Sequence, residues 1–312
     1  MNASKPPTIF VLLGPTSSGK TDLILELSEL INVEVLNCDS RQIYKDMPIG
    51  TAQPTAEILE KVNHHLVNFL PADQQFSAGQ FRKKCDLLIP EILNRGNLPV
   101  VCGGTGFYYR SLSTQMLELP RNERLEQEIS KMTHLERVQL LKQKDQRSVV
   151  EPGESAAAGR IHPNDQYRIE RALLVLLQTG RPLRDYYESG FELRQDLNFV
   201  GFWLDVDFEK WQVAVRLRAR QMIDSGMVDE ATRIRDQFGN CAALNTVGYL
   251  EALQCADKKI SEQEFEEKLI GSHLQYGRHQ RLWFRKQTNL PKFSKQEAVN
   301  YFQKELKSII HS

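Results

Sequence analysis

The segment Gly14–Thr21 restricts the fold of this chain more than any other feature. Its residues fit the pattern G-x-x-x-x-G-K-[ST], in which glycines let the backbone curl so that N–H groups point inward at a phosphate. The apolar run 9–13 precedes it, and apolar residues recur at helical spacing from Leu23 to Leu30. The order is therefore strand, phosphate-holding loop, helix.

This loop predicts binding of a diphosphate or nucleotide. Lys20 adds a point charge, and the hydroxyl of Thr21 is a predicted ligand for Mg²⁺. The same kind of loop occurs in ATPases, kinases and other transferases, so it does not identify the phosphate compound. The predicted binding residues are Gly14, Pro15, Thr16, Ser17, Ser18, Gly19, Lys20 and Thr21.

Three further apolar runs, 33–36, 98–102 and 199–204, are each bounded by loop residues, as buried parallel strands are. Strands that alternate with helices predict an α/β fold with a doubly wound, mostly parallel sheet of the P-loop NTPase-like kind. Ligands bind beyond the carboxyl ends of such strands. Asp39 and residues 103–105 lie at such ends.

Between these strands the pattern changes to apolar residues every three or four positions, with charges between them. We therefore predict a helical insertion at 119–198, within an α/β core of residues 1–118 and 199–312. One helix of this insertion should run from Tyr167 to Gln178 and end at Gly180. The C-terminal part of the core is predicted to be helical.

Charge is balanced overall but uneven along the chain. Forty basic and 40 acidic side chains cancel, yet residues 268–295 hold seven Lys or Arg, two His and no acid, a pattern typical of binding to a polyanion. Arg278, Arg281 and Arg285 recur at helical spacing and predict one basic face. The neighbouring Trp283 and Phe284 either stack on nucleobases or pack in the core.

Cysteine usage and hydropathy indicate the compartment. The 5 cysteines include no C-x-x-C pair and favour a reducing environment. No run approaches 18 apolar residues, and no signal segment precedes the first strand, so we expect a cytoplasmic protein without a membrane span.

Asp39 has two interpretations from its position alone. Its carboxylate follows the second predicted strand and should reach the space in front of the loop, where a base for an incoming nucleophile would act. An Asp-Ser pair is equally typical of a turn.

Several longer motifs span nearly the whole chain in a fixed order. They are 39–45 (DSRQIYK), 49–54 (IGTAQP), 64–66 (HHL), 76–78 (FSA), 103–109 (GGTGFYY), 160–165 (RIHPND), 247–249 (VGY) and 278–285 (RHQRLWFR). Taken together, the chain resembles the bacterial tRNA dimethylallyltransferases, also called tRNA isopentenyltransferases.

The resemblance implies an activity. Members transfer a dimethylallyl group from dimethylallyl diphosphate to the exocyclic amine of the adenine just 3′ of the anticodon, in tRNAs that read codons starting with U. It assigns Asp39 as the base, and Lys20, Thr21 with Mg²⁺, and Arg218 as the groups that neutralise the leaving diphosphate. Spacing alone does not separate Arg218 from Arg216 and Arg220 on the same predicted helix.

We expect a monomer. The resemblance also implies that the chain contacts the anticodon stem-loop, with the insertion gripping the stem. Gln53 and Asn245 replace the Lys and Arg that are usual at their positions, which puts individual RNA contacts there in doubt. The implied tRNA contacts are Asp39, Ser40, Arg41, Gln42, Thr105, Arg124, Tyr167, Arg168, Ile169, Glu170, Arg171, Asn245, Thr246, Val247, Gly248, Tyr249, Leu250, Arg278, His279, Gln280, Arg281, Leu282, Trp283, Phe284 and Arg285.

Three other functions fit parts of the sequence. A kinase would use ATP, and the run that ends at Asp205 resembles a strand with a metal-binding Asp, but a kinase does not need the basic segment 278–295. Prenyl transfer to free adenine nucleotides would not need that segment or the insertion. An RNA-binding module switched by a nucleotide would need neither Asp39 nor Arg218 as reactive groups.

Overall fold

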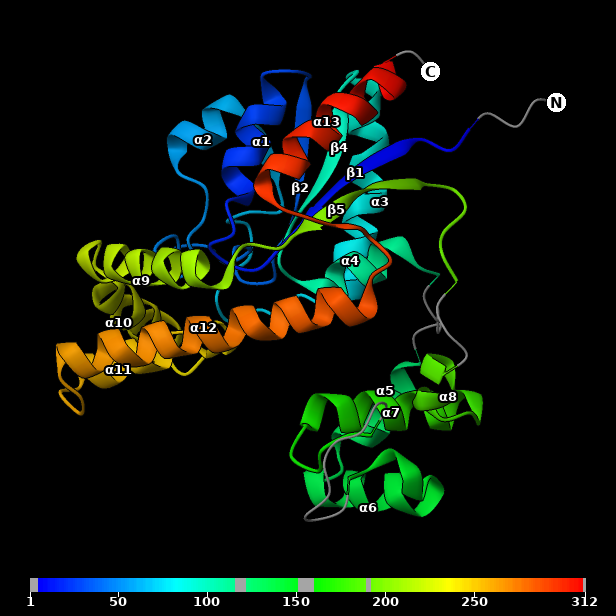
Figure 1. The fold of residues 1–312 in the computed structure, drawn as a ribbon. Coiled ribbons are helices and arrows are strands. Elements are labelled where there is room, and N and C mark those ends of the chain that lie inside the picture. The colour runs from blue at the N-terminus through cyan, green and yellow to red at the C-terminus, as the bar shows by residue number, and fades with distance from the viewer. Residues whose placement is uncertain (1–4, 116–121, 151–159, 189–191, 311–312) are drawn as a thin grey trace. The chain divides into compact units, whose positions relative to one another are not determined.

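The computed structural model describes residues 5–115, 122–150, 160–188 and 192–310, which form two compact units (Figure 1). Unit 1 consists of Met1–Ser113 and Arg194–Ser312, and unit 2 is Thr114–Leu193. The predicted insertion, 119–198, starts at a residue outside the described ranges.

Unit 1 contains a parallel sheet. The four predicted strands are present, and two short strands that the sequence did not predict form its edges. Asn63–His65 and Lys292–Phe293 are only three and two residues long, too short to show a periodic pattern. In spatial order the sheet is β3 (Asn63–His65), β2 (Val33–Cys38), β4 (Leu98–Gly103), β1 (Thr8–Leu13), β5 (Asn198–Leu204) and β6 (Lys292–Phe293).

Helices cover both faces of the sheet. Side chains of β1 alternate, with Val11 in the core beneath α3 (Ala78–Asn94) and α4 (Gly106–Ser113), and Leu12 in the core beneath α1 (Lys20–Ser28) and α13 (Lys295–Ile310). Because both faces are covered, every buried residue of β1 is apolar. The short helix α2 (Ala56–Lys61) precedes β3.

A second layer of helices holds a core of its own. It comprises α9 (Phe208–Asp224), α10 (Met227–Phe238), α11 (Tyr249–Ala256) and α12 (Glu262–Gln287), with a short 3₁₀ turn at Ala242–Asn245. A Ser261–Glu264 capping box starts α12. This helix connects the two cores, because Phe265 packs among the helices and Phe284 packs in the core of the sheet (Figure 1).

Unit 2 is helical, with α5 (Glu123–Ser130), α6 (His134–Lys144), a 3₁₀ turn at Gln146–Ser148, α7 (Gln166–Thr179) and α8 (Leu183–Glu188). The predicted end of α7 is confirmed, since Gly180 caps it at a φ of 71°. A buried ion pair joins Arg184 to Asp145 at 2.7 Å. Among the described residues of both units, no helix combines the length and apolar character that crossing a membrane requires.

Candidate active site at the carboxyl edge of the sheet

The Gly14–Thr21 loop connects β1 to the first turn of α1. Gly19 precedes α1 at a φ of 84°, a left-handed conformation that glycine adopts without steric cost. The hydroxyls of Ser17 and Ser18 are buried and have no hydrogen-bond partner. The loop therefore combines the positive end of a helix with unpartnered donors, an arrangement that suits an anion.

Lys20 folds back over this loop. Its Nζ donates to the carbonyl oxygens of Gly14 at 3.0 Å and Pro15 at 2.7 Å. Burial of the ammonium group lowers the pKa of Lys20 to about 8, although the nearby Asp39 raises it. Lys20 is thus a cation near neutral pH whose charge is sensitive to its surroundings.

Two helices of the second layer brace the loop at Thr16. The indole N–H of Trp211 on α9 donates to the Thr16 carbonyl at 2.9 Å, and the Thr16 N–H donates to Oε1 of Gln280 on α12 at 2.9 Å. The amide of Gln280 also donates to the Gly104 carbonyl at 2.9 Å. Gln280, a predicted tRNA contact, is buried and fixes the loop to the end of β4.

Asp39 follows β2 and is half-buried at the same edge. Its Oδ1 accepts from the Arg41 N–H at 2.9 Å, the bond expected of an Asp turn, and the Ser40 N–H donates to Oγ1 of Thr105 at 2.9 Å. The side-chain amide of Gln53 also stabilises this turn, because it donates hydrogen bonds to the carbonyl oxygens of Gln42 and Tyr44. Because the turn uses one carboxylate oxygen, it leaves the other free for the role of a base.

Arg218 turns inward from α9, whereas Arg216 and Arg220 are exposed and Arg220 pairs with Glu266 at 2.8 Å. The Nε of Arg218 is buried without a partner. Burial lowers the pKa of Arg218, and Asp39 opposes that shift, while Arg218 in turn lowers the pKa of Lys20. Lys20, Asp39 and Arg218 are therefore close enough to interact electrostatically. Only the fold distinguishes Arg218 from its neighbours.

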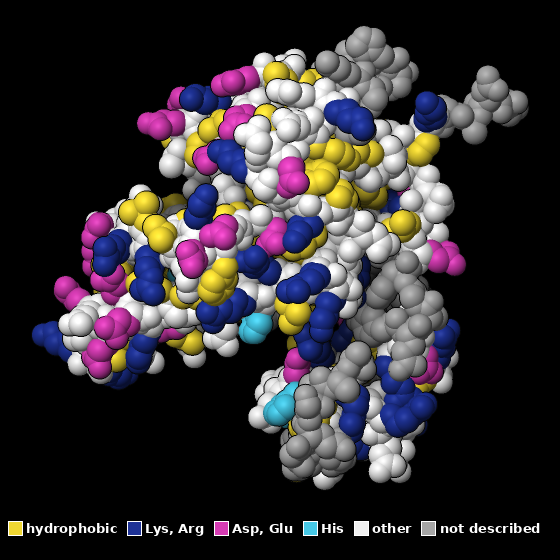
Figure 2. All heavy atoms as spheres, viewed as in Figure 1, with side chains coloured by type: hydrophobic (Ala, Val, Ile, Leu, Met, Phe, Trp, Pro, Cys, Tyr) yellow, Lys and Arg dark blue, Asp and Glu magenta, His cyan; other side chains and the backbone are white. Residues whose placement is uncertain are grey.

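The predicted basic face of α12 is divided by the structure. Arg281 forms an ion pair with Asp205, and its guanidinium carbon lies 5.8 Å from the centroid of the Trp211 ring. Phe284 is fully buried, 5.9 Å from Trp203 between ring centroids, so the core interpretation of Phe284 is confirmed. Within 278–285, the side chains that remain exposed are Arg278, His279, Leu282 and Arg285. Figure 2 shows Lys and Arg side chains over this helix.

Trp283 is half-buried beside α4. The guanidinium carbon of Arg110 lies 5.2 Å from the centroid of its ring, and Phe107 packs at 6.0 Å between ring centroids. Phe107 itself is 50% exposed.

Residues 245–250 mostly support packing. Tyr249 is fully buried, and its hydroxyl donates to Oε1 of Glu230 at 2.6 Å. Glu230 also accepts from the N–H groups of Ile49 and Gly50, each at 2.9 Å. Sequence reasoning missed this buried Glu, which joins α10 to the loop before Gln53. Thr246 and Gly248 are buried and Val247 is half-buried, which leaves Asn245 and Leu250 exposed.

The predicted tRNA contacts of unit 2 are largely on its surface. Tyr167, Arg168 and Glu170 are exposed, Arg171 is half-buried, and Ile169 is fully buried in the core of the unit. The exposed Arg124 pairs with Glu128 at 3.0 Å.

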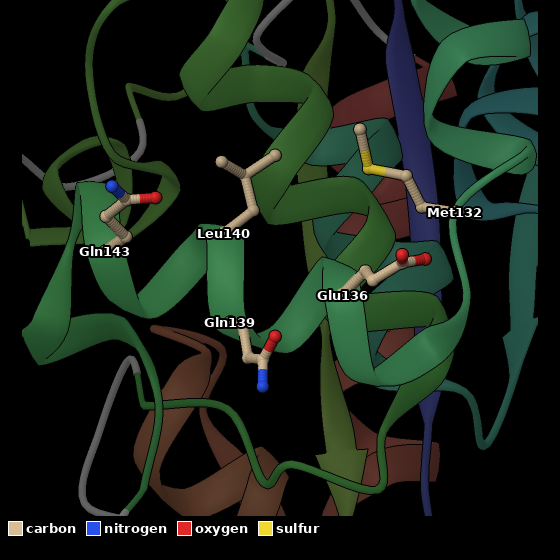
Figure 3. A pocket seen from close by; sticks show the side chains of 5 residues that line it. All are labelled: Met132, Glu136, Gln139, Leu140 and Gln143. Carbon is tan, nitrogen blue, oxygen red and sulfur yellow. The ribbon is translucent and has the colours of Figure 1, made fainter.

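A hollow on unit 2 has no evident chemistry. It is lined by Met132, Glu136, Gln139, Leu140 and Gln143 (Figure 3). The Glu136 carboxylate accepts from the Thr133 N–H at 2.7 Å as a helix cap. The candidate site is therefore at the sheet edge of unit 1.

Two residues near this edge were not predicted. His273 and Tyr276 lie on α12 one to two turns before Gln280, on its inward side. Burial raises the pKa of Tyr276, and Asp39 adds to this shift. Burial lowers the pKa of His273 to about 4, and Arg218 contributes. Their helical spacing from Gln280 could have indicated that they share its side of α12. Using that spacing required knowing that this side faces the loop.

The fold and the geometry of the site are those expected of an α/β enzyme that acts on a phosphate compound. A phosphate-holding loop at the carboxyl ends of parallel strands faces a carboxylate and two cations. The protein-family model described as IPP transferase matches residues 42–287, a range that starts just after Asp39. The chain belongs to the IPP transferase family.

Individual relatives agree with this membership. The chain is 32% identical to the tRNA dimethylallyltransferase of Koribacter versatilis, over 90% of this chain and 91% of the relative, and 34% identical to that of Leptospira interrogans, over 93% and 96%. The solved tRNA isopentenylpyrophosphate transferase of Bacillus halodurans has a TM-score of 0.68 and 27% identity, covering 97% of both chains. A eukaryotic dimethylallyltransferase acting on tRNA has a TM-score of 0.75 at 21% identity, covering 96% of this chain and 77% of its own, and shows a common fold.

Proposed function

We propose that this chain transfers the dimethylallyl group of dimethylallyl diphosphate to the exocyclic amine of the adenine 3′ of the anticodon, in tRNAs that read codons starting with U. The observation that carries the proposal is that a carboxylate, Asp39, interacts electrostatically with two half-buried cations, Lys20 and Arg218. The relatives from Koribacter versatilis and Leptospira interrogans, named tRNA dimethylallyltransferases, support it.

The reaction needs help at both ends. The amine nitrogen forms a bond to the first carbon of the prenyl group, the bond from that carbon to the diphosphate oxygen breaks, and its electron pair leaves with the diphosphate. The amine is a weak nucleophile because its lone pair is delocalised into the ring, so Asp39 accepts the departing proton. The N–H groups of the Gly14–Thr21 loop, Lys20 and Arg218 stabilise the charge that develops on the leaving group.

The loop also suits Mg²⁺. Mg²⁺ is usually held by few protein oxygens together with substrate phosphates and water. The exposed hydroxyl of Thr21 at the start of α1 can supply one such oxygen, and no group of three or more His, Cys, Asp or Glu in the described ranges forms a separate metal cluster. When bound, the ion would add positive charge beside the leaving diphosphate.

The substrate amine belongs to a base in a folded RNA, so the adenine must leave its stack to reach Asp39. We assign tRNA contacts to the exposed Arg278 and Arg285 of α12 and to the exposed Tyr167 and Arg168 of unit 2. The architecture, a P-loop NTPase-like doubly wound sheet, is consistent with a donor held at the carboxyl edge.

We further propose a monomeric, cytoplasmic enzyme.

The kinase alternative is weakened by Asp205. In a kinase this carboxylate at the end of β5 would be available for metal binding, but here it pairs with Arg281 and, at 3.2 Å, with Lys292. Two cations therefore already neutralise it.

The deciding experiment incubates the purified protein and Mg²⁺ with unmodified tRNA and labelled dimethylallyl diphosphate, with ATP in a parallel tube. Label that enters tRNA without ATP supports the proposal. Free adenosine monophosphate in a third tube tests the nucleotide alternative. ATP turnover without label in RNA overturns the proposal.

A further inference from the structure

His273 is a buried polar residue that the reaction described above does not use. It lies on the inward side of α12, only 7% exposed, and its Nε2 is buried without a hydrogen-bond partner. Leaving such a group unpaired destabilises a folded protein, so a buried orphan atom beside a reaction centre calls for a partner that arrives from outside.

The surroundings of His273 indicate what that partner is. Arg218 on the neighbouring helix α9 is near enough to lower the pKa of His273, and its Nε is a second buried atom without a partner. These two helices pack together and both brace Thr16 of the phosphate-holding loop, through Trp211 and Gln280 (Figure 1). Two unsatisfied nitrogens therefore lie on facing helices, and Arg218 is also near enough to Lys20 of the loop to lower its pKa.

We propose that His273 is a further diphosphate-binding residue, whose Nε2–H donates a hydrogen bond to a phosphate oxygen beside Arg218. This inference rests on the proposed function, because it identifies the anion as the donor's diphosphate. Since the pKa of His273 is lowered to about 4, its ring is neutral near pH 7. A neutral ring offers a donor without adding a third cation to Lys20 and Arg218, and the incoming anion raises the pKa of His273 back toward its usual value.

Two substitutions of similar size separate this role from packing. His273→Gln keeps an amide N–H at about the position of Nε2, and His273→Leu keeps the volume without a donor. The probe is inorganic diphosphate with Mg²⁺, measured by isothermal titration calorimetry. A hydrogen bond to a charged group predicts that His273→Leu weakens binding on the order of tenfold or more, and that His273→Gln recovers most of it. KM for dimethylallyl diphosphate should rise in parallel, with KM for tRNA within a few-fold of wild type.

Wild-type affinity for diphosphate in His273→Leu overturns the inference, as does an equal loss in both variants together with a lower Tm. If neither variant folds, ¹⁵N-histidine NMR of the wild-type chain decides. Addition of diphosphate must then shift the Nε2 resonance of one strongly buried histidine, and an unchanged histidine spectrum overturns the role. Labelling of tRNA by the wild type tests the proposed function separately, so failure of this inference can be distinguished from failure of that function.

Discussion

The inward and outward sides of α12 differ in burial and in contacts, although the sequence presents them as one basic stretch. The inward side carries Gln280, which braces the phosphate-holding loop, and His273, which lies beside Arg218. The outward side carries Arg278 and Arg285, both exposed. Burial, rather than charge or spacing, separates the residues of the proposed reaction centre from the residues that we assign to RNA.

The largest expected effect is at the centre that the inward side supports. We predict that Asp39→Ala leaves tRNA binding within a few-fold but lowers turnover on the order of a hundredfold or more, because a general base is lost. Single-turnover labelling of tRNA and a filter-binding assay measure the two quantities. Turnover equal to wild type would remove Asp39 from the mechanism.

Alanine substitutions at two glycines of α12 compare its two sides through their effects on the free energy of unfolding. A methyl group at Gly277 would lie 2.2 Å from the buried ring of Trp211, whereas Gly271 on the same helix has nothing within 4 Å. We expect Gly277→Ala to lower the free energy of unfolding by about 1–3 kcal/mol through overpacking. Gly271→Ala, the matched control, should raise it by roughly 0.5–1 kcal/mol through helix propensity. Urea unfolding measures both, and equal shifts would contradict the assignment of sides.

The titration of Lys20 predicts how the affinity for diphosphate depends on pH. Its charged form binds the anion, and its pKa is lowered to about 8, so affinity for inorganic diphosphate should fall as pH rises above 8, approaching tenfold per pH unit. Lys20→Arg, which stays charged, corrects for titration of the ligand itself. Calorimetry from pH 7 to 10 checks this, and parallel curves for the two proteins would contradict it.

The smallest expected effect is on the outward side. Arg285→Glu should weaken tRNA binding and make its salt dependence shallower by about one counterion, because one phosphate contact is lost. Lys84→Glu on α3 is the control with the same change of charge. Arg281→Gln should leave the salt slope unchanged, since Arg281 already pairs with Asp205. A slope for Arg285→Glu identical to that of the control would place Arg285 off the RNA.

Local patterns were sufficient to predict the elements that form the candidate site. The strand before Gly14, the loop itself and the helix after it follow from apolar runs and from glycines that permit a curled backbone. The position of Asp39 at the end of β2 follows in the same way. Each of these depends on residues adjacent in the chain.

Other assignments depended on contacts between distant segments. Spacing could not show that Arg218 turns inward while Arg216 and Arg220 do not. Nor could it show that the hydroxyl of Tyr249 donates a hydrogen bond to Glu230. Gln53, which lacks the usual positive charge, instead holds the Asp39 turn through two carbonyl oxygens. These outcomes depend on partners far apart in sequence.

The sequence by itself determined the phosphate-holding loop, the alternation of strands and helices, and a basic segment near the C-terminus, because backbone preference and periodicity are properties of short stretches. The tertiary structure decided which polar side chains are buried together. Packing α9 and α12 against the loop buries His273, Gln280 and the Nε of Arg218 and leaves Arg285 in water, and a difference in solvation of that kind is absent from the order of residues.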